Sequence, residues 1–165
     1  MTTTAARCDE CGALHSGGIT CRACFEALLA FENERPAAFG AVHHLTVACY
    51  FLQHPRGYNE AALQMWRDLL ADSLDGRAAT QDLIRRAGRQ FQGARGVRDP
   101  LAARPAWWPP TWPVTVDAVL RPDEEPTIDT YIQRAFEWAG QTRAQLEQQH
   151  RPLHLTSESG GQRLP

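Results

Sequence analysis

Lysine is absent from this 165-residue sequence, so all 17 basic residues are arginine. They nearly balance 19 acidic residues, which gives a formal net charge of −2 and an isoelectric point of about 6.3. A chain so close to neutrality lacks the strong positive field that draws proteins to nucleic acids or anionic membranes. Any nucleic-acid contact would therefore depend on a local patch.

Long apolar runs are also missing. No stretch approaches the roughly 18 consecutive apolar residues that cross a bilayer. The opening residues, MTTTAARCDEC, lack the apolar segment of a secretory signal. We therefore expect a cytoplasmic protein. Because the cytosol keeps thiols reduced, the five cysteines are not expected to form a disulfide framework, and their spacing needs another explanation.

Four of the five cysteines form two Cys-x2-Cys pairs, Cys8 with Cys11 and Cys21 with Cys24. Each pair lets two thiolates converge on one ion, and four sulfurs complete a closed tetrahedral site. A closed site leaves no coordination position for a substrate, so the ion would stabilise the fold and would not catalyse. The sequence predicts a zinc knuckle over residues 8–24 that holds one structural zinc ion with these four cysteines.

Other uses of the cysteines stay open. A thioredoxin-like redox pair would need a β-α-β pattern, which is absent, whereas four thiolates could also hold an iron–sulfur cluster. His15 lies between the pairs and could replace a cysteine as ligand, although four well-spaced sulfurs favour a loop position for it. We expect Cys24 in the first turn of a helix and Cys49 as a small buried apolar residue.

Hydrophobic periodicity predicts an all-α fold, with a helical bundle of about five helices over residues 25–154. The expected helices cover 22–34, 37–54, 59–74, a segment from 80 and 128–150, with a short helix over 115–120. In the last long helix, the spacing predicts burial of Ile128, Ile132, Ala135, Phe136 and Ala139. Residues 1–7 and 155–165 are expected to be disordered.

The helix expected over 37–54 carries the densest chemistry, with three histidines and a tyrosine in an apolar run. It should be central and buried, with one apolar stripe at three- and four-residue steps that consists of Phe39, Val42, Leu45, Cys49 and Leu52. His43 and His54 are eleven residues apart, or roughly 16 Å along a helix axis, so they cannot bind one metal together. A tyrosine–histidine pair would also form for structural reasons. The candidate catalytic residues, with no reaction assigned, are His44, Tyr50, His54 and His150.

A local basic patch follows in the chain. Between residues 81 and 104, six arginines against two aspartates give a balance of +4. Arg85, Arg86 and Arg89 are therefore candidate nucleic-acid contacts. A run of this kind is more often a solvated helix face, and the acidic segment 117–129 could compensate for its charge.

A crossover over residues 104–114 sets three tryptophans among prolines, which no helix interior tolerates. If exposed, Trp107, Trp108 and Trp112 would form a partner-binding surface; if buried, they would cap the bundle. Burial is favoured on general grounds, because a free tryptophan surface is costly.

The blocks VHHLTVACYFLQHP and WWPPTWPVTVDAVL, with the Cys-x2-Cys-Gly start, resemble the bacterial family catalogued as domain of unknown function 5946. The resemblance covers roughly residues 8–150 and implies an architecture but no activity. Members commonly carry Asp where this chain has Ala48, and His where it has Trp66. They also carry a histidine pair near the end of the last helix, of which His150 remains. The missing partners argue against enzymatic activity in this chain.

We therefore favour a non-enzymatic, zinc-stabilised helical protein that binds a protein partner. One alternative is a helical-bundle enzyme, active or degenerate, with a histidine-lined metal or acid–base pocket. The other is a nucleic-acid-binding protein that uses the zinc knuckle and the arginine helix. No phosphate loop, nucleophile elbow or paired-carboxylate motif indicates a reaction class.

Overall fold

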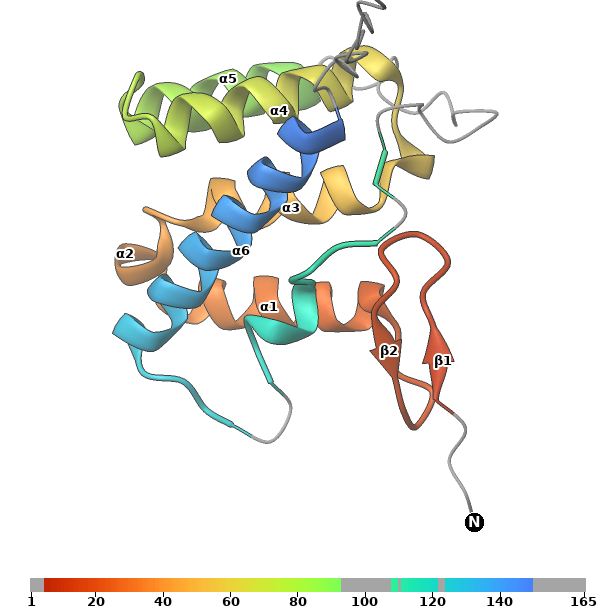
Figure 1. Ribbon diagram of the computed structural model, residues 1–165. Coiled ribbons are helices and arrows are strands. Elements are labelled where there is room, and N and C mark those ends of the chain that lie inside the picture. Colours follow the sequence, from red (N-terminus) through yellow and green to blue (C-terminus); the bar gives the residue numbers. More distant parts are fainter. Residues whose placement is uncertain (1–4, 93–107, 110, 122–123, 150–165) are drawn as a thin grey trace, which may run out of the picture.

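The structure of the chain is a computed structural model that describes residues 5–92, 108–109, 111–121 and 124–149. Over these residues it consists of α-helices and one small hairpin (Figure 1), which confirms the predicted helical bundle. None of the described helices combines the length and the apolar character needed to cross a membrane. The calls for disorder in residues 155–165 and for sites at Trp107 and His150 concern residues outside these ranges.

The chain begins with two short antiparallel strands, β1 (Ala6–Arg7) and β2 (Leu14–His15), which pair Ala6 with His15 and Arg7 with Leu14. Ala6 and Arg7 are thus ordered, although the sequence predicts disorder for residues 1–7. The α-helices are α1 (Cys21–Glu34), α2 (Pro36–Phe39), α3 (His43–Gln53), α4 (Glu60–Leu74), α5 (Thr80–Gln92) and α6 (Ile128–Gln149). Single 3₁₀ turns are η1 (Pro55–Gly57) and η3 (Val116–Ala118).

Helix boundaries follow local capping chemistry. The side chain of Thr20 accepts a hydrogen bond from the Ala23 amide at the start of α1, and Asn59 does the same for α4. The single helix predicted over 37–54 is divided into α2 and α3. Gly40 stands at this break, where only glycine fits, because a Cβ there would lie 2.8 Å from the carbonyl oxygen of Pro36.

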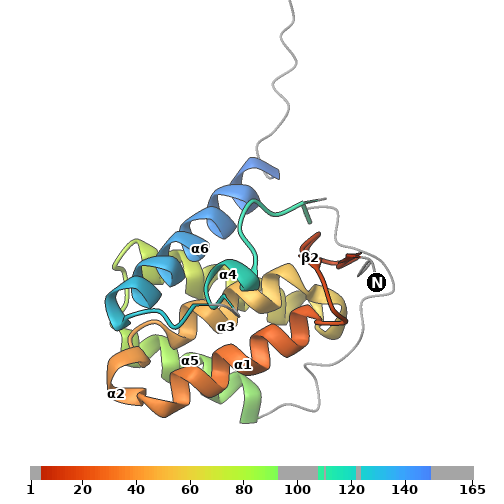
Figure 2. The ribbon, with the colours of Figure 1, turned by 90° about the horizontal axis from the view of Figure 1, so that it is seen from below.

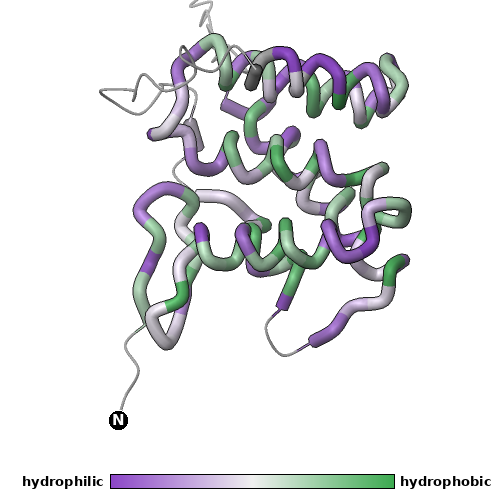
Figure 3. The backbone as a smooth tube through the Cα atoms, turned by 180° about the vertical axis from the view of Figure 1, so that it is seen from behind, coloured by the Kyte–Doolittle hydropathy of each residue, from purple (hydrophilic) through white to green (hydrophobic). Residues whose placement is uncertain are grey.

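Helix α3 is the centre of the bundle. Figure 1 shows it between α1 on one side and α4 with α5 on the other, and it packs against both α4 and α6. Figure 3 shows hydrophobic and hydrophilic positions alternating along the helices. The stripe predicted for this part of the chain is fully buried and consists of Phe39, Val42, Leu45, Cys49 and Leu52. The central position expected for this segment is confirmed.

The buried face of α6 differs from the prediction. Ile128 and Phe136 are 36% and 47% exposed, so their predicted burial is wrong. The predicted burial of Ala135 and Ala139 is confirmed, and Ile132 is half-buried. The other buried residues of the helix are Tyr131, Trp138, Thr142 and Leu146. Burying the larger surfaces of Tyr131 and Trp138 accounts for this orientation.

The segment that precedes α6 runs beside α1, and its 3₁₀ turn η3 packs against that helix (Figure 2). The Gln53 side-chain amide of α3 donates to the carbonyl of Val114 (2.9 Å) and to the hydroxyl of Thr142 (3.1 Å), which ties this segment to the core. Trp108 and Trp112 are both 7% exposed. Both side chains are therefore buried, as expected if they cap the bundle, and little of their surface is accessible to a partner.

Candidate metal centre

Three cysteines and one histidine meet beside the start of α1. Cys8, Cys11, Cys21 and His54 each place one ligand atom within 4.8 Å of the others. The Sγ atoms of Cys11 and Cys21 are 3.4 Å apart, and Cys8 Sγ lies 3.7 Å from His54 Nε2. Ligands of a tetrahedral zinc ion lie about 3.5–3.8 Å from one another when the metal–ligand bonds are about 2.0–2.3 Å. The four groups therefore suit a tetrahedral metal ion.

The turn of the β1–β2 hairpin positions the first two cysteines. The amide of Cys8 donates to the carbonyl of Ala13 (2.8 Å), and the amide of Gly12 donates to the carbonyl of Cys8 (2.9 Å). Gly12 has φ +83°, a conformation that residues with a Cβ rarely adopt. The amide of Ala13 also points at Cys11 Sγ (3.5 Å). The turn thus holds both sulfurs on its inner side.

His54 supplies the imidazole from the C-terminal end of α3. Its Nδ1 lies 2.9 Å from the backbone carbonyl oxygen of Tyr50. Because a carbonyl only accepts, Nδ1 carries the proton, and Nε2 keeps a lone pair directed toward the sulfurs. The ring of Tyr50 stacks on His54 at 4.3 Å and on Phe25 of α1 at 3.8 Å. The Tyr50 ring, which is itself stacked on Phe25, therefore supports the orientation of the imidazole.

Ion pairing joins the hairpin to the residues just after His54. The guanidinium of Arg56 lies 2.8 Å from Asp9, and the Arg56 amide donates to Glu10 (3.3 Å). Asp9 and Glu10 lie between the two hairpin cysteines. These exposed contacts contribute little stability, but they keep the hairpin in register with η1.

Two of the sulfurs are close enough to share a proton. A hydrogen bond from the Cys21 thiol lowers the pKa of Cys11, and the same contact raises the pKa of Cys21. His15 Nε2 lies 2.9 Å from Cys21 Sγ but outside the four-residue group. Crowding sulfurs in this way favours a cation between them, since two thiolates repel each other otherwise.

Cys24 does not belong to the four-residue group found among the described residues. It lies one turn after Cys21 on α1, as predicted, and is half-buried. Burial raises its pKa, and the nearby charge of Asp117 raises it further. The four-cysteine ligand set stays a prediction, whereas the geometry groups three of those cysteines with His54.

Three of the candidate catalytic residues, His44, Tyr50 and His54, lie at different positions along α3 and its C-terminal end. His44 lies at the start of α3, where its Nε2 is 2.8 Å from the hydroxyl of Ser73, and burial lowers its pKa. Its Nδ1 is buried without a hydrogen-bond partner among the described residues. Tyr50 lies six residues further along, roughly 9 Å away along the axis, and His54 ten residues further along, roughly 15 Å away.

The candidate nucleic-acid residues lie on α5, and two of them are already paired. Arg85 forms an ion pair with Asp82, and Arg86 pairs with Asp72 of α4 at 2.9 Å. Arg89 is exposed. The carboxylates that pair with Arg85 and Arg86 therefore belong to α4 and α5. Nucleic-acid contact stays a prediction.

Comparison with known proteins places the chain in a family. The family model described as a family of unknown function (DUF5946) matches residues 6–147. Neither curated proteins nor solved structures show a significant match. The matched residues include the hairpin, helices α1 to α5, α6 up to residue 147 and the four clustered ligand residues. The chain therefore belongs to the family of unknown function DUF5946.

Proposed function

We propose that the chain is a zinc-stabilised helical protein that binds a protein partner through its N-terminal module, residues 6–24. The ligand chemistry supports zinc, because three thiolates and one imidazole are a common set in structural zinc sites. Cys8, Cys11, Cys21 and His54 would complete four-coordination. With no position left open, the ion would stabilise the fold and would not catalyse.

The observation that carries partner binding is the exposed apolar surface of this module. Leu14 is 59% exposed and Ile19 is 42% exposed. They border a hollow of about 380 Å³ that is also lined by His15, Ser16, Cys24, Asp117, Ala118 and Arg121. Apolar side chains around a hollow with a charged rim are typical of protein-binding surfaces.

The residues around the hollow indicate the chemistry of the partner. Leu14 and Ile19 suit an apolar anchor side chain, while Asp117 and Arg121 offer one charge of each sign at the rim. A protein segment with an apolar residue flanked by a basic and an acidic residue fits this surface best. The metal would hold Leu14 in place, because it joins the hairpin to α1 and α3.

Site-specific photo-crosslinking tests the proposal. A photoreactive phenylalanine analogue is placed at Leu14 and, as the matched control, at Phe136, which is exposed on α6. In cells that express the chain, we expect a discrete adduct with one protein from position 14 only. Substituting Cys11 with Ser should abolish that adduct, because the hairpin loses its metal.

Three outcomes would overturn the partner-binding proposal. They are the absence of an adduct at position 14, the same adduct from position 136, and an adduct that survives loss of the metal site. The zinc assignment is tested separately by metal analysis of the purified chain. About one zinc per chain supports it, while no metal, or iron with sulfide, contradicts it.

A further inference from the structure

A second polar cluster lies at the other end of α3 from the metal centre. Glu32 of α1 is only 4% exposed, and its carboxylate accepts three hydrogen bonds. His43 Nδ1 is 2.5 Å from Oε2, while the hydroxyls of Thr46 and Tyr131 are 2.9 Å and 2.6 Å from Oε1. Burial raises the pKa of Tyr131, so its hydroxyl remains a donor. Residues of α1, α3 and α6 thus converge on one buried charge.

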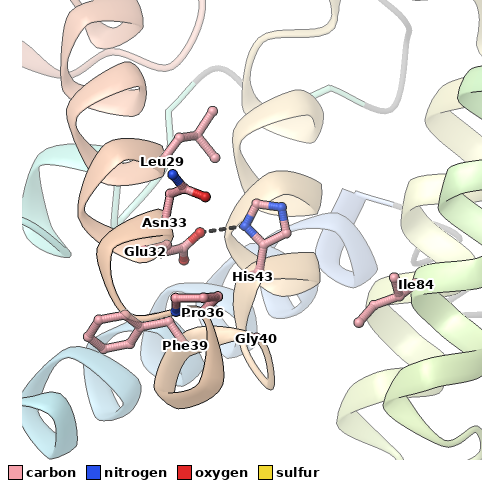
Figure 4. Close-up of a pocket in the computed structure, with 8 residues that line it drawn as sticks. All are labelled: Leu29, Glu32, Asn33, Pro36, Phe39, Gly40, His43 and Ile84. Carbon is pink, nitrogen blue, oxygen red and sulfur yellow. Dashed lines mark hydrogen bonds and ion pairs between the residues drawn. The ribbon is translucent and has the colours of Figure 1, made fainter.

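The cluster borders a pocket of about 290 Å³, close to the lower end of the range for small-molecule sites, roughly 300–1,000 Å³. Figure 4 shows His43 in the middle of the lining residues, with one ring nitrogen directed at Glu32. The lining is mostly apolar and comprises Leu29, Glu32, Asn33, Pro36, Phe39, Gly40, His43 and Ile84. Ile84 of α5 is 44% exposed, so the pocket opens beside an apolar side chain that the fold leaves uncovered.

A structural role explains only part of this arrangement. It accounts for Thr46 and Tyr131, which are buried and hold the helices together through Glu32. It does not account for His43, whose side chain is 49% exposed beside the pocket. The second ring nitrogen of His43, Nε2, has no hydrogen-bond partner among the described residues. Glu32 fixes the ring and leaves this nitrogen available.

The charge state of His43 selects the kind of ligand. The hydrogen bond to Glu32 raises the pKa of His43, which favours the imidazolium form. In that form Nε2 carries a proton and donates, so it needs an acceptor. An amine would be repelled by the imidazolium, and an alcohol would lack the charge that strengthens the contact.

From the placement of His43 between a buried carboxylate and an apolar pocket, we infer that the pocket binds a small organic carboxylate. The ligand carboxylate accepts from His43 Nε2, and its apolar part packs against Leu29, Pro36 and Ile84. Glu32 is a positioning residue that orients the imidazole and does not touch the ligand. This site is separate from the metal centre and from the proposed partner surface.

Ligand titrations followed by NMR test the inference on the full metal-loaded chain. The probes are hexanoate, 1-hexanol and hexylamine, which share an apolar chain and differ in charge. At pH 7 we expect saturable binding of hexanoate, with shifts of the Leu29, His43 and Ile84 signals. The affinity for the other two probes should be at least about ten-fold weaker, because each lacks the charge-assisted hydrogen bond.

Variants separate a binding role from a structural one. Replacing His43 with Gln should weaken hexanoate binding by about ten-fold or more. Ile84→Asp places a negative charge at an exposed position beside the pocket, so the fold should tolerate it. The aspartate repels the ligand carboxylate, so hexanoate binding should be lost. Phe136→Ala, on the outer side of α6, should leave the affinity unchanged. Equal binding of the three probes, no saturation, or full affinity in Ile84→Asp would overturn the inference.

Discussion

His54 donates its Nδ1 proton to the carbonyl oxygen of Tyr50, 2.9 Å away and one turn earlier on α3. The same carbonyl also accepts the backbone amide of His54, and the ring contact fixes the tautomer of the imidazole. The lone pair of Nε2 then faces Cys8, 3.7 Å away. The end of the central helix is thereby adapted to hold a metal ligand.

The identity of the fourth ligand can be tested by comparing two single variants. We expect His54→Gln to weaken zinc binding by at least about ten-fold, because it removes a ligand from the clustered set. Cys24→Ser should leave the affinity nearly unchanged, since Cys24 lies outside that set. Competition with a chromophoric chelator measures both. The reverse ranking would restore the four-cysteine set predicted from the sequence.

Metal removal should destabilise the chain without unfolding its helices. A chelator withdraws a ligand that binds the folded chain more tightly than the unfolded chain, so the free energy of unfolding falls by at most RT ln(1 + [metal]/Kd). We expect a lower Tm by calorimetry, with most of the far-ultraviolet helical signal retained at 25 °C, because the core around α3 consists of apolar side chains. Adding zinc back is the control. An unchanged Tm after chelation would contradict this expectation.

The central stripe should carry much of the stability. Leu45 is fully buried on α3, so Leu45→Ala should reduce the free energy of unfolding by about 2–5 kcal/mol. Phe136→Ala removes a larger side chain that is 47% exposed, and should cost less than Leu45→Ala. Chemical denaturation of both variants provides the comparison. A larger loss for Phe136 would show that its outer face is covered.

Two glycines should respond oppositely to alanine. Gly76 ends α4 with φ +64°, so Gly76→Ala should destabilise the chain by about 1 kcal/mol. Gly140 lies inside α6, where a Cβ would meet no atom within 4 Å. Gly140→Ala should therefore stabilise it by about 0.5–1 kcal/mol. Urea midpoints measure both changes, and shifts of the same sign would contradict the assigned conformations.

The pair of His43 and Glu32 predicts a dependence of stability on pH. The pKa of His43 in the folded chain is raised above its ordinary value of 6.5. The stabilisation is therefore complete below about pH 6.5 and is lost as the pH rises through the raised value. Burial raises the pKa of Tyr131, so its titration lies above this range. Burial lowers the pKa of His44, so its contribution reduces stability only below about pH 6.5 and leaves the fall above neutral pH unaffected.

Urea denaturation between pH 5 and 9 measures this dependence, and NMR titration of the imidazole gives the pKa directly. His43→Gln should flatten the part of the profile that falls above neutral pH. A His43 pKa below 6.5 in the folded chain would refute the assignment of the pair.

The sequence predicts the helices well because their apolar spacing directly reflects burial. The stripe from Phe39 to Leu52 is a case in point, since every predicted member is buried. The buried face of α6 is harder to predict, because Ile128 and Tyr131 each begin an apolar stripe. Only the neighbouring helices decide which of the two stripes is buried. Local patterns are informative where one face dominates.

The metal ligands show the same limit over a longer range. Local spacing correctly marks Cys8, Cys11 and Cys21 as a group, but it says nothing about a side chain 46 residues away from Cys8. His54 becomes a neighbour only when α3 docks beside α1. The sequence has one available signal, a histidine directly before Pro55 at the end of an apolar helix. Glu32 is not predicted either, because its partners come from two other helices, α3 and α6.

The separation of Cys8 and His54 also bears on the order of folding. A metal ion held by three cysteines of the first 21 residues can bind early and loosely, before the bundle exists. A fourth bond, from His54, would form only after α3 is helical up to its last turn and has docked on α1, because until then the imidazole is neither oriented nor near. A spectroscopically visible ion such as cobalt would therefore report, through its change from three to four protein ligands, the moment at which the core closes.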